Sequence, residues 1–477
     1  MSKHLEGHES LSLFGRMPLL LKEREYGTLG AHGNCFAYAI ATWAFLTGGY
    51  AAQYVGAVQG VVCLVAGNII GVLMMALPLS LACHRYGLEQ IDSCKPAFGQ
   101  YGARVILVFY LFNLIGWSGL ILVMFGNGIE NIVLALGFHP PAWLVGAGVA
   151  AGIIMTYVVV THGVHLLKIF NAVVTPILAV LIIYMFYLLM SHYSWEEIAS
   201  APPLEPLDDP LLNYAIALEL GVASGISWWG GIGFLARNTR TRRNSIFPEL
   251  LQLGLVFGLV CSIALFSALV IGSDDPTQWM VPLGGVFLGV LALGFVALAN
   301  ITSTAVSVFA SGLALRHIHA LHTLPWRGIV AITIIPLCFF VVWPQQLYDW
   351  GDAFLAYNGT LQAPVGGIVM VDYFLLRRQR LELRAIFDSA PSGSYYYWKG
   401  FNRLALACVL LGQAAYFSMY NPSTGSAHWL FHWIPASIAA FVLPGVVYWI
   451  GMHRHFAGTL AKARTEFGEP RIVTPNI

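Results

Sequence analysis

The composition of this chain is that of a membrane protein. It has 477 residues, of which 58% are hydrophobic and 10% charged, whereas about a quarter of the residues in an ordinary soluble domain are charged. A membrane-spanning helix takes about 20 apolar residues, so this length holds roughly a dozen spans and excludes a large soluble catalytic domain. The net charge of +1 gives no reason to expect a nucleic-acid partner.

Apolar stretches of spanning length follow one another along almost the whole chain. They predict an all-α polytopic membrane protein with twelve transmembrane helices embedded in the lipid bilayer. The expected spans are residues 29–54, 57–83, 104–134, 142–161, 166–191, 212–235, 248–272, 281–314, 327–343, 347–376, 400–420 and 429–452.

The cationic residues predict the orientation of these spans. All 24 Lys and Arg residues lie in the two tails or around alternate connections, beginning with the connection between the second and third spans. The other connections carry only acidic charges, on Glu196, Glu197, Glu205, Asp208, Asp209, Asp274 and Asp275. Because cationic loops stay on the cytoplasmic side, we expect both tails, residues 1–28 and 453–477, to be cytoplasmic in a plasma or inner membrane.

Small and flexible residues in the middle of two spans predict interrupted helices. The first span contains Thr47-Gly48-Gly49, and the sixth contains Ser224-Gly225 at a similar depth. Unwound backbone is tolerated inside a membrane where it lines a cavity, so these two segments are expected to meet near a binding site.

The same two spans suggest an internal repeat. Aligned at an offset of 176 residues, Tyr38–Ala41 matches Tyr214–Ala217. The first span runs outward and the sixth inward, which predicts a five-plus-five inverted repeat, as in many secondary transporters. The expected parts are residues 29–191 for the first repeat, 212–376 for the second and 400–452 for the last two spans.

Glu219 lies well inside the apolar stretch of the sixth span. A carboxylate at membrane depth is costly and indicates a functional site. It could bind a substrate N–H, carry a coupling proton or attract a cation. The alternative is a solvated side chain near the outer mouth.

The eighth span contains a polar cluster that includes Thr302, Ser303 and Thr304. Adjacent hydroxyls with nearby carbonyls supply the hard oxygen ligands that a small cation requires. Hydroxyls that bond back to their own helix are the structural alternative.

Aromatic and amide side chains inside other spans are candidates for substrate contact. Trp117, Trp228 and Trp229 lie away from the interfacial belts where Trp is usual, and a planar ligand stacks well on such rings. Simple packing is the alternative for each of them. In the tenth span, Asn358 and Gln362 form a polar stripe.

Enzymatic function and ATP-driven transport find no support in the sequence. It contains no HExxH, no GxSxG and no glycine-rich phosphate loop. We therefore expect neither an enzyme nor an organic cofactor.

Several segments together resemble the nucleobase:cation symporter family, which includes the hydantoin, cytosine and allantoin permeases. The resemblance extends over about residues 25–452. The segments that carry it are Thr47–Gly49, Lys95–Gly102, Gly116-Trp117, Phe234–Arg237, Ala310–Leu313, Pro364–Gly367 and Val371–Tyr373. It implies the inverted-repeat fold of the bacterial leucine transporter, in agreement with the repeat above.

The resemblance also implies a sodium site between the first and eighth spans. The family pattern A-x-x-[ST]-[ST] matches Ala299, Thr302 and Ser303, with backbone carbonyls expected from Ala37 and Ile40. Sodium would then be the coupling ion.

Family substrates are planar heterocycles held between aromatic residues of spans 3 and 6 and bonded by amides. Trp117 matches the aromatic position of span 3, but the amide usual one turn later is Ile121 here. In span 6 the family aromatic aligns near Ser224 or Gly225. Residues that could replace the missing amides are Glu219, Asn113, Thr304, Asn358 and Gln362.

The sequence thus predicts a secondary active transporter that imports a nucleobase-like or related planar heterocycle with a coupling cation, Na⁺ or H⁺. The expected substrate-binding residues are Trp117, Asn113, Glu219, Ser224, Trp228, Trp229, Thr304, Asn358 and Gln362. The alternatives are a proton-coupled carrier of another small metabolite or vitamin, and a channel.

Overall fold

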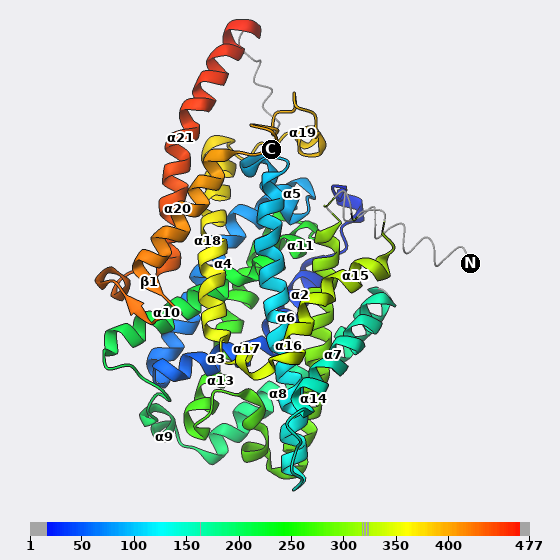
Figure 1. Cartoon of the computed structure of the whole chain (residues 1–477), viewed down its shortest axis with the longest axis vertical. Helices are drawn as coiled ribbons and strands as arrows, with labels where there is room; N and C mark the ends of the chain where they lie inside the picture. Colours follow the sequence, from blue (N-terminus) through cyan, green and yellow to red (C-terminus); the bar gives the residue numbers. More distant parts are fainter. Residues whose placement is uncertain (1–16, 163, 317, 319–320, 322–323, 468–477) are drawn as a thin grey trace, which may run out of the picture.

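Long helices packed side by side form the body of the molecule (Figure 1). The computed structural model describes residues 17–162, 164–316, 318, 321 and 324–467, with backbone alone over 164–171 and 454–467. Within these residues, nine segments are long and apolar enough to cross a membrane. The helices that form these segments, wholly or in part, are α4 (Ala57–Tyr86), α6 (Gly102–Ala135), α7 (Leu144–Thr161), α8 (Val164–His192), α10 (Pro210–Ser227), α13 (Phe257–Ile271), α14 (Met280–Leu315), α18 (Gly351–Met370) and α21 (Ala436–Phe467).

Shorter elements complete the other expected spans or connect them. Apolar helices of intermediate length are α15 (Trp326–Ile334) with α16 (Phe339–Val342), and α20 (Arg403–Met419). The connections contain elements that the apolar pattern did not predict, namely α5 (Gln90–Phe98), α9 (Trp195–Ser200), α12 (Arg242–Pro248), α17 (Pro344–Tyr348), α19 (Leu383–Phe387) and a hairpin of β1 (Tyr420–Asn421) and β2 (Ser426–Ala427).

The first and sixth spans are interrupted. In the first, α2 (Thr28–Ala39) and α3 (Trp43–Tyr54) are separated by residues 40–42. In the sixth, α10 passes into a 3-10 turn, η2 (Trp228–Gly230), before α11 (Ile232–Arg237) begins. Both expected interruptions are therefore present, but they lie at other residues than the sequence predicted.

The glycines that were expected to break these spans allow close helix packing instead. A Cβ added to Gly48 would lie 2.2 Å from the backbone oxygen of Cys261 in α13. A Cβ added to Gly225 would lie 2.8 Å from the Cα of Gly71 in α4. Membrane helices commonly approach each other through such small residues. The prediction that Thr47–Gly49 and Ser224–Gly225 interrupt their helices was therefore wrong.

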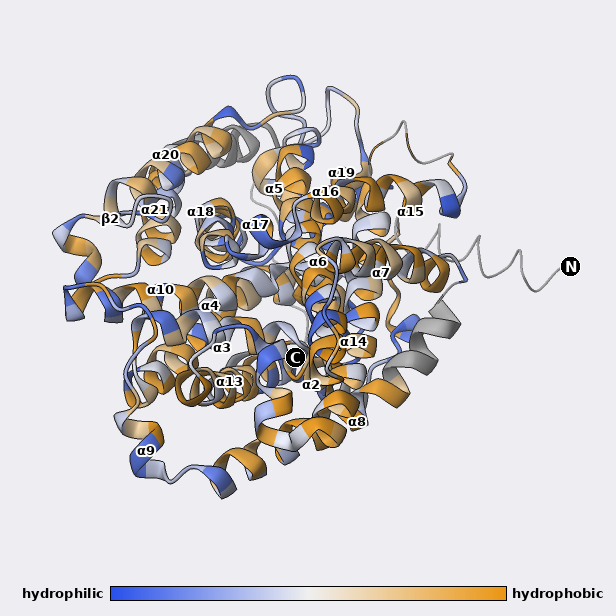
Figure 2. Cartoon of the chain, turned by 60° about the horizontal axis from the view of Figure 1, so that its bottom comes forward, coloured by the Kyte–Doolittle hydropathy of each residue, from blue (hydrophilic) through white to orange (hydrophobic). Residues whose placement is uncertain are grey.

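Large apolar side chains are exposed on the outside of the bundle. Phe287, Ile183 and Leu410 expose 81%, 70% and 66% of their surface, respectively. Figure 2 shows hydrophobic residues over the peripheral helices α7, α8 and α20, with many of the hydrophilic residues in the connections. A surface of this kind is stable against lipid rather than water. The chain is a multi-pass membrane protein.

Candidate substrate-binding site

A cavity lies where the two interruptions face α6, α13 and α14. Its volume is about 50 Å³, below the range of about 300–1,000 Å³ usual for small-molecule sites, so its walls must move apart to admit a ligand of ordinary size. Its aromatic lining consists of Tyr38, Trp43, Trp117, Trp228 and Phe257, and its polar lining includes Asn113, Ser227 and Ser307. None of the described residues that line this cavity is charged.

The aromatic rings form a continuous group around the cavity. The ring centroid of Trp43 lies 5.6 Å from that of Trp228 and 6.3 Å from that of Trp117. Tyr38 stacks on Trp43 at 6.1 Å, and Phe257 meets Trp228 edge-on at 5.1 Å. Because aromatic pairs prefer stacked or edge-to-face geometry, these contacts hold one another in place and offer ring surfaces to a planar ligand.

Two polar atoms at the cavity have no hydrogen-bond partner among the described residues. Asn113 donates through Nδ2 to the backbone oxygen of Ser227 over 2.8 Å, which leaves its Oδ1 as an unpaired acceptor. The indole Nε1 of Trp228 is an unpaired donor. Since buried polar atoms are nearly always paired, a ligand with one N–H donor and one carbonyl acceptor would satisfy both.

Side chains of α6 also fix the interruption of the sixth span. The Tyr110 hydroxyl donates to the backbone oxygen of Gly230 over 3.0 Å, one turn before Asn113 reaches Ser227. An interrupted helix leaves carbonyl groups without helical partners, and these donors satisfy two of them. Trp228 lies between the two anchored carbonyls and is thereby held at the cavity.

Trp229 and Ser224, both expected to bind substrate, pack behind the cavity. The Trp229 ring meets Tyr110 edge-on at 5.9 Å and is fully buried. Ser224 donates to Oδ1 of Asn68 in α4 over 3.1 Å. Neither residue belongs to the described cavity lining. The cavity ring of span 6 is that of Trp228, not one near Ser224.

The predicted polar residues of α14 and α18 bond within their own helices. Thr304 donates through Oγ1 to the backbone oxygen of Asn300 over 2.8 Å. In α18, Nε2 of Gln362 donates to Oδ1 of Asn358 over 2.9 Å, and both side chains are buried. These three predicted residues are not among the described residues that line the cavity.

Glu219 of α10 contacts the beginning of α21 and does not line the aromatic cavity. Its Oε2 accepts the backbone N–H of Ser437 over 3.1 Å, and its Oε1 accepts the hydroxyl of the same residue. A separate small cavity connects Glu219 with Asp352 and Tyr420. The carboxyl group is buried and hydrogen-bonded, so it differs from a solvated side chain at a mouth.

The α14 part of the expected cation site is buried. Ala299, Thr302 and Ser303 expose 0%, 4% and 8% of their surface. Thr302 donates through Oγ1 to the backbone oxygen of Ala299 over 2.8 Å. The hydroxyl oxygen of Thr302 keeps its lone pairs in this arrangement, so it can still accept a cation.

The other part of that site lies in the first span. Ile40 is the first residue of the interruption, and Ala37 belongs to the last turn of α2. Ala37 and Val306 of α14 line the same cleft, one that also includes α8 and α11 residues. Val306 lies one turn after Thr302 and Ser303 along α14. The first span and α14 therefore face each other near the expected ligands.

Sequence reasoning did not include several residues of the cavity among the site residues. Tyr38 and Trp43 flank the interruption of the first span, and Phe257 and Ser307 complete the opposite wall. Two aromatic residues five positions apart at the interruption were the available signal. It was missed because the interruption itself was expected at Thr47–Gly49.

Interrupted helices around a buried, uncharged cavity define a membrane transporter rather than a passive bundle. Residues 34–451 match the family described as permease for cytosine/purines, uracil, thiamine, allantoin. The chain belongs to this family, which confirms the resemblance found in the sequence. It is a secondary active transporter of nucleobase-like compounds.

Individual proteins are similar to the chain over most of its length. The hydantoin permease of Microbacterium maritypicum is 24% identical over 439 residues, covering 87% of this chain and 86% of the relative. The allantoin permease of Bacillus subtilis is 24% identical over 434 residues, covering 81% of this chain and 82% of the relative. These relatives are permeases and not enzymes.

Solved structures show the same fold. The inward-facing conformation of Mhp1 superposes with a TM-score of 0.77 at 20% identity, over 96% of this chain and 97% of that one. A second structure is that of Mhp1, a nucleobase-cation-symport-1 family transporter, in a closed conformation with bromovinylhydantoin bound. It superposes with a TM-score of 0.72 at 20% identity, over 95% of this chain and 99% of that one.

Proposed function

We propose that this permease imports a neutral, planar heterocyclic compound that binds in the aromatic cavity together with a coupling cation. The observation that carries the proposal is the cavity itself, with rings on several sides and two unpaired polar atoms, Asn113 Oδ1 and Trp228 Nε1. A charged ligand would lose its hydration without gaining an ionic partner from the described lining, so a neutral ligand fits better.

The proposed architecture has twelve spans arranged as a five-plus-five inverted repeat with two additional helices. Support comes from the interruptions in the first and sixth spans, which bring unwound backbone to one cavity. The alternation of cationic and acidic connections supports cytoplasmic termini.

Sodium is the proposed coupling ion, bound by Thr302 and Ser303 with the backbone oxygens of Ala37, Ile40 and Ala299. The support is chemical: two buried hydroxyls lie on the helix that shares a cleft with the end of α2. An ion that draws α14 and the first span together would favour the substrate-binding geometry, and the coupling must then be reciprocal.

Proton coupling through Glu219 is the second candidate. A buried carboxyl group that contacts α21 and shares a cavity with Asp352 supports it. In this case Glu219→Gln would make transport insensitive to pH, and sodium would have no effect on the native protein.

Uptake into proteoliposomes tests the proposal. Labelled hydantoin, allantoin, uracil and thiamine are offered to native protein with an inward sodium gradient, a proton gradient or neither. We expect saturable uptake and counterflow of at least one compound, driven by sodium and lost in Thr302→Ala/Ser303→Ala. Thr333→Ala is the matched control, because that buried hydroxyl also bonds its own helix, over 2.9 Å, in α15.

Three other outcomes would change the account. Sodium dependence that survives in the double variant would remove the proposed sodium site. Uptake driven by pH alone would favour Glu219. Flux without saturation or counterflow would indicate a channel.

A further inference from the structure

Gln90 of α5 bridges the interruption of the sixth span without reaching the cavity. Its Nε2 donates to the backbone oxygen of Trp229, and its Oε1 accepts the backbone N–H of Gly233 over 2.9 Å. The side chain is 1% exposed, and Gln90 is not among the described residues that line the cavity. One amide therefore joins the backbone of the 3-10 turn at the interruption to the backbone of α11.

This pairing matches what an interrupted helix lacks. The end of one helical segment leaves carbonyls free, and the beginning of the next leaves N–H groups free. A carboxamide offers one of each kind of partner, and inside a membrane no bulk water replaces it. Gln90 supplies the clamp on the α5 side, while Tyr110 and Asn113 hold Gly230 and Ser227 from α6.

We call the two hydrogen bonds of Gln90 to Trp229 and Gly233 the clamp. Gly233 packs closely against the Gln90 side chain. A Cβ at position 233 would lie 2.5 Å from Oε1 of Gln90 and 2.8 Å from its Cβ. Contacts this short do not occur between real side chains, so a larger residue at Gly233 must displace Gln90. The two residues are therefore coupled through direct packing as well as through the hydrogen bond.

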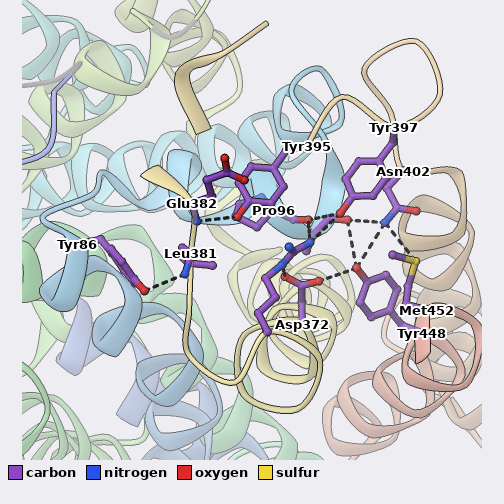
Figure 3. Close-up of polar contacts among 12 residues, drawn as sticks. Tyr86, Pro96, Asp372, Leu381, Glu382, Tyr395, Tyr397, Asn402, Tyr448 and Met452 are labelled. Carbon is purple, nitrogen blue, oxygen red and sulfur yellow. Dashed lines mark hydrogen bonds and ion pairs between the residues drawn. The ribbon is translucent and has the colours of Figure 1, made fainter. Parts of the chain in front are cut away.

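The far end of α5 is itself anchored (Figure 3). The backbone oxygen of Pro96 accepts from Nη2 of Arg377 over 2.7 Å and from the Tyr397 hydroxyl over 2.6 Å. Asn402 donates to the backbone oxygen of Ala97 over 2.8 Å. Helix α5 is thus a fixed support from which Gln90 reaches the interruption.

We propose that Gln90 is a positioning residue of the substrate site: its bidentate contact fixes residues 229–233 and thereby holds the Trp228 ring at the cavity. This inference rests on the proposed function of the cavity. It predicts that loss of the clamp loosens the interruption and weakens ligand binding, although Gln90 itself touches no ligand.

Hydrogen–deuterium exchange of the purified full-length protein without ligand tests the clamp directly. In Gln90→Ala, we expect the peptide containing residues 228–235 to exchange about tenfold faster, because both hydrogen bonds from Gln90 to that backbone are lost, including the one to the N–H of Gly233. Asn213→Ala is the matched control. Its amide makes the same two-bond contact with the backbone of Leu207, over 2.9 Å in both bonds, at the other end of α10. Equal exchange in both variants, or no change in Gln90→Ala, would overturn the proposal.

A double-mutant cycle covers the case in which Gln90→Ala folds poorly. Gly233→Ala should accelerate exchange of the same peptide, even though Ala is the better helix former, because its Cβ displaces Gln90. In Gln90→Ala/Gly233→Ala, the added methyl group should cause a smaller further change than it causes alone, because the hydrogen bonds are already lost and only the contact with the Cβ of residue 90 remains. Additive effects of the two substitutions would contradict direct coupling.

Binding of hydantoin and allantoin separates this inference from the proposed function. Gln90→Glu keeps the size and the acceptor but sets an oxygen against the Trp229 carbonyl. We expect it to weaken binding of either compound about tenfold, as Gln90→Ala does. Native-like affinity in Gln90→Glu would show that Gln90 acts only by filling space and not through its hydrogen bond to Trp229. Gln90→Ala could exchange faster while native protein binds neither hydantoin nor allantoin. That result would support the role of Gln90 in fixing the backbone and would contradict the proposed function of the cavity as a site for these compounds.

Discussion

Among single residues, Asn113 provides the polar acceptor of the cavity. Its Nδ2 is bonded to Ser227, so only Oδ1 is available to a ligand. Asn113→Ala should weaken binding of the transported heterocycle by about 0.5–1.5 kcal/mol for the ligand bond, and by more if Trp228 moves. Calorimetric titration of native and variant protein measures this change. Undiminished affinity would show that the ligand lies elsewhere.

Trp43 makes a separate prediction, because its ring contacts both Trp117 and Trp228. Trp43→Leu removes these two contacts and the stacking on Tyr38, three aromatic contacts of about 0.5–1.5 kcal/mol each, and should lower ligand affinity more than the stability of the unliganded protein. Binding and thermal unfolding are measured on the same preparation. A loss of stability with intact affinity would show that Trp43 packs the protein and does not contribute to ligand binding.

The residues that line the cavity were only partly predictable from the sequence. Trp117 and Trp228 were predicted as aromatic residues inside spans, and Asn113 as a replacement for an amide that the family resemblance implies, and all three line one cavity. Trp229, Thr304 and Gln362 are also aromatic or polar residues inside spans, but each packs on or bonds to a neighbouring residue and none of them lines that cavity. A sequence indicates which residues are polar or aromatic at membrane depth, but not what each one meets.

Close helix contacts decide stability at the scale of elements. Gly225→Val places side-chain atoms against Gly71 and the backbone oxygen of Asn68, which lies 2.4 Å from an added Cβ. Overpacking of this kind should cost about 1–3 kcal/mol and lower the unfolding temperature. Gly294→Val is the control, because an added Cβ there meets nothing within 4 Å. Equal stability of the two variants would contradict this account of α4 and α10.

The positions of the spans were more predictable than their interruptions. Hydropathy gave the ends of α6 and α14 within two residues, because lipid imposes a long apolar stretch on each span. The interruptions were misplaced because small residues serve two purposes in membrane helices, flexibility and close packing. Gly48 and Gly225 have the second purpose, which depends on the partner helix.

Arg377 links three parts of the chain at the scale of the whole molecule. It forms an ion pair of 2.5 Å with Asp372, and the two side chains are 10% and 3% exposed. Burial alone would lower the pKa of Arg377, but Asp372 and Tyr397 outweigh it and raise the pKa above its ordinary value. Its contribution to stability is therefore fully present at neutral pH and is lost only in strong alkali.

Removing this arginine should destabilise the whole bundle. Arg377→Gln leaves the buried Asp372 carboxylate without its cation and should cost about 3–5 kcal/mol at neutral pH. Thermal unfolding of the native protein and of Arg377→Gln at neutral pH measures this cost. Native-like stability of Arg377→Gln would contradict a stabilising role of the ion pair.

Binding of a heterocycle together with sodium is the central claim for the whole molecule. Thermal unfolding of the purified protein with hydantoin, allantoin, nucleobases and heterocyclic vitamins, each in sodium and in choline buffer, tests it most directly. A bound ligand at about one hundred times its dissociation constant stabilises the folded state by about 2.7 kcal/mol. We predict that at least one neutral heterocycle raises the unfolding temperature, more in sodium than in choline, and less in Asn113→Ala than in the native protein. A panel without any stabilising compound, or a shift that sodium and Asn113→Ala leave unchanged, would contradict the account.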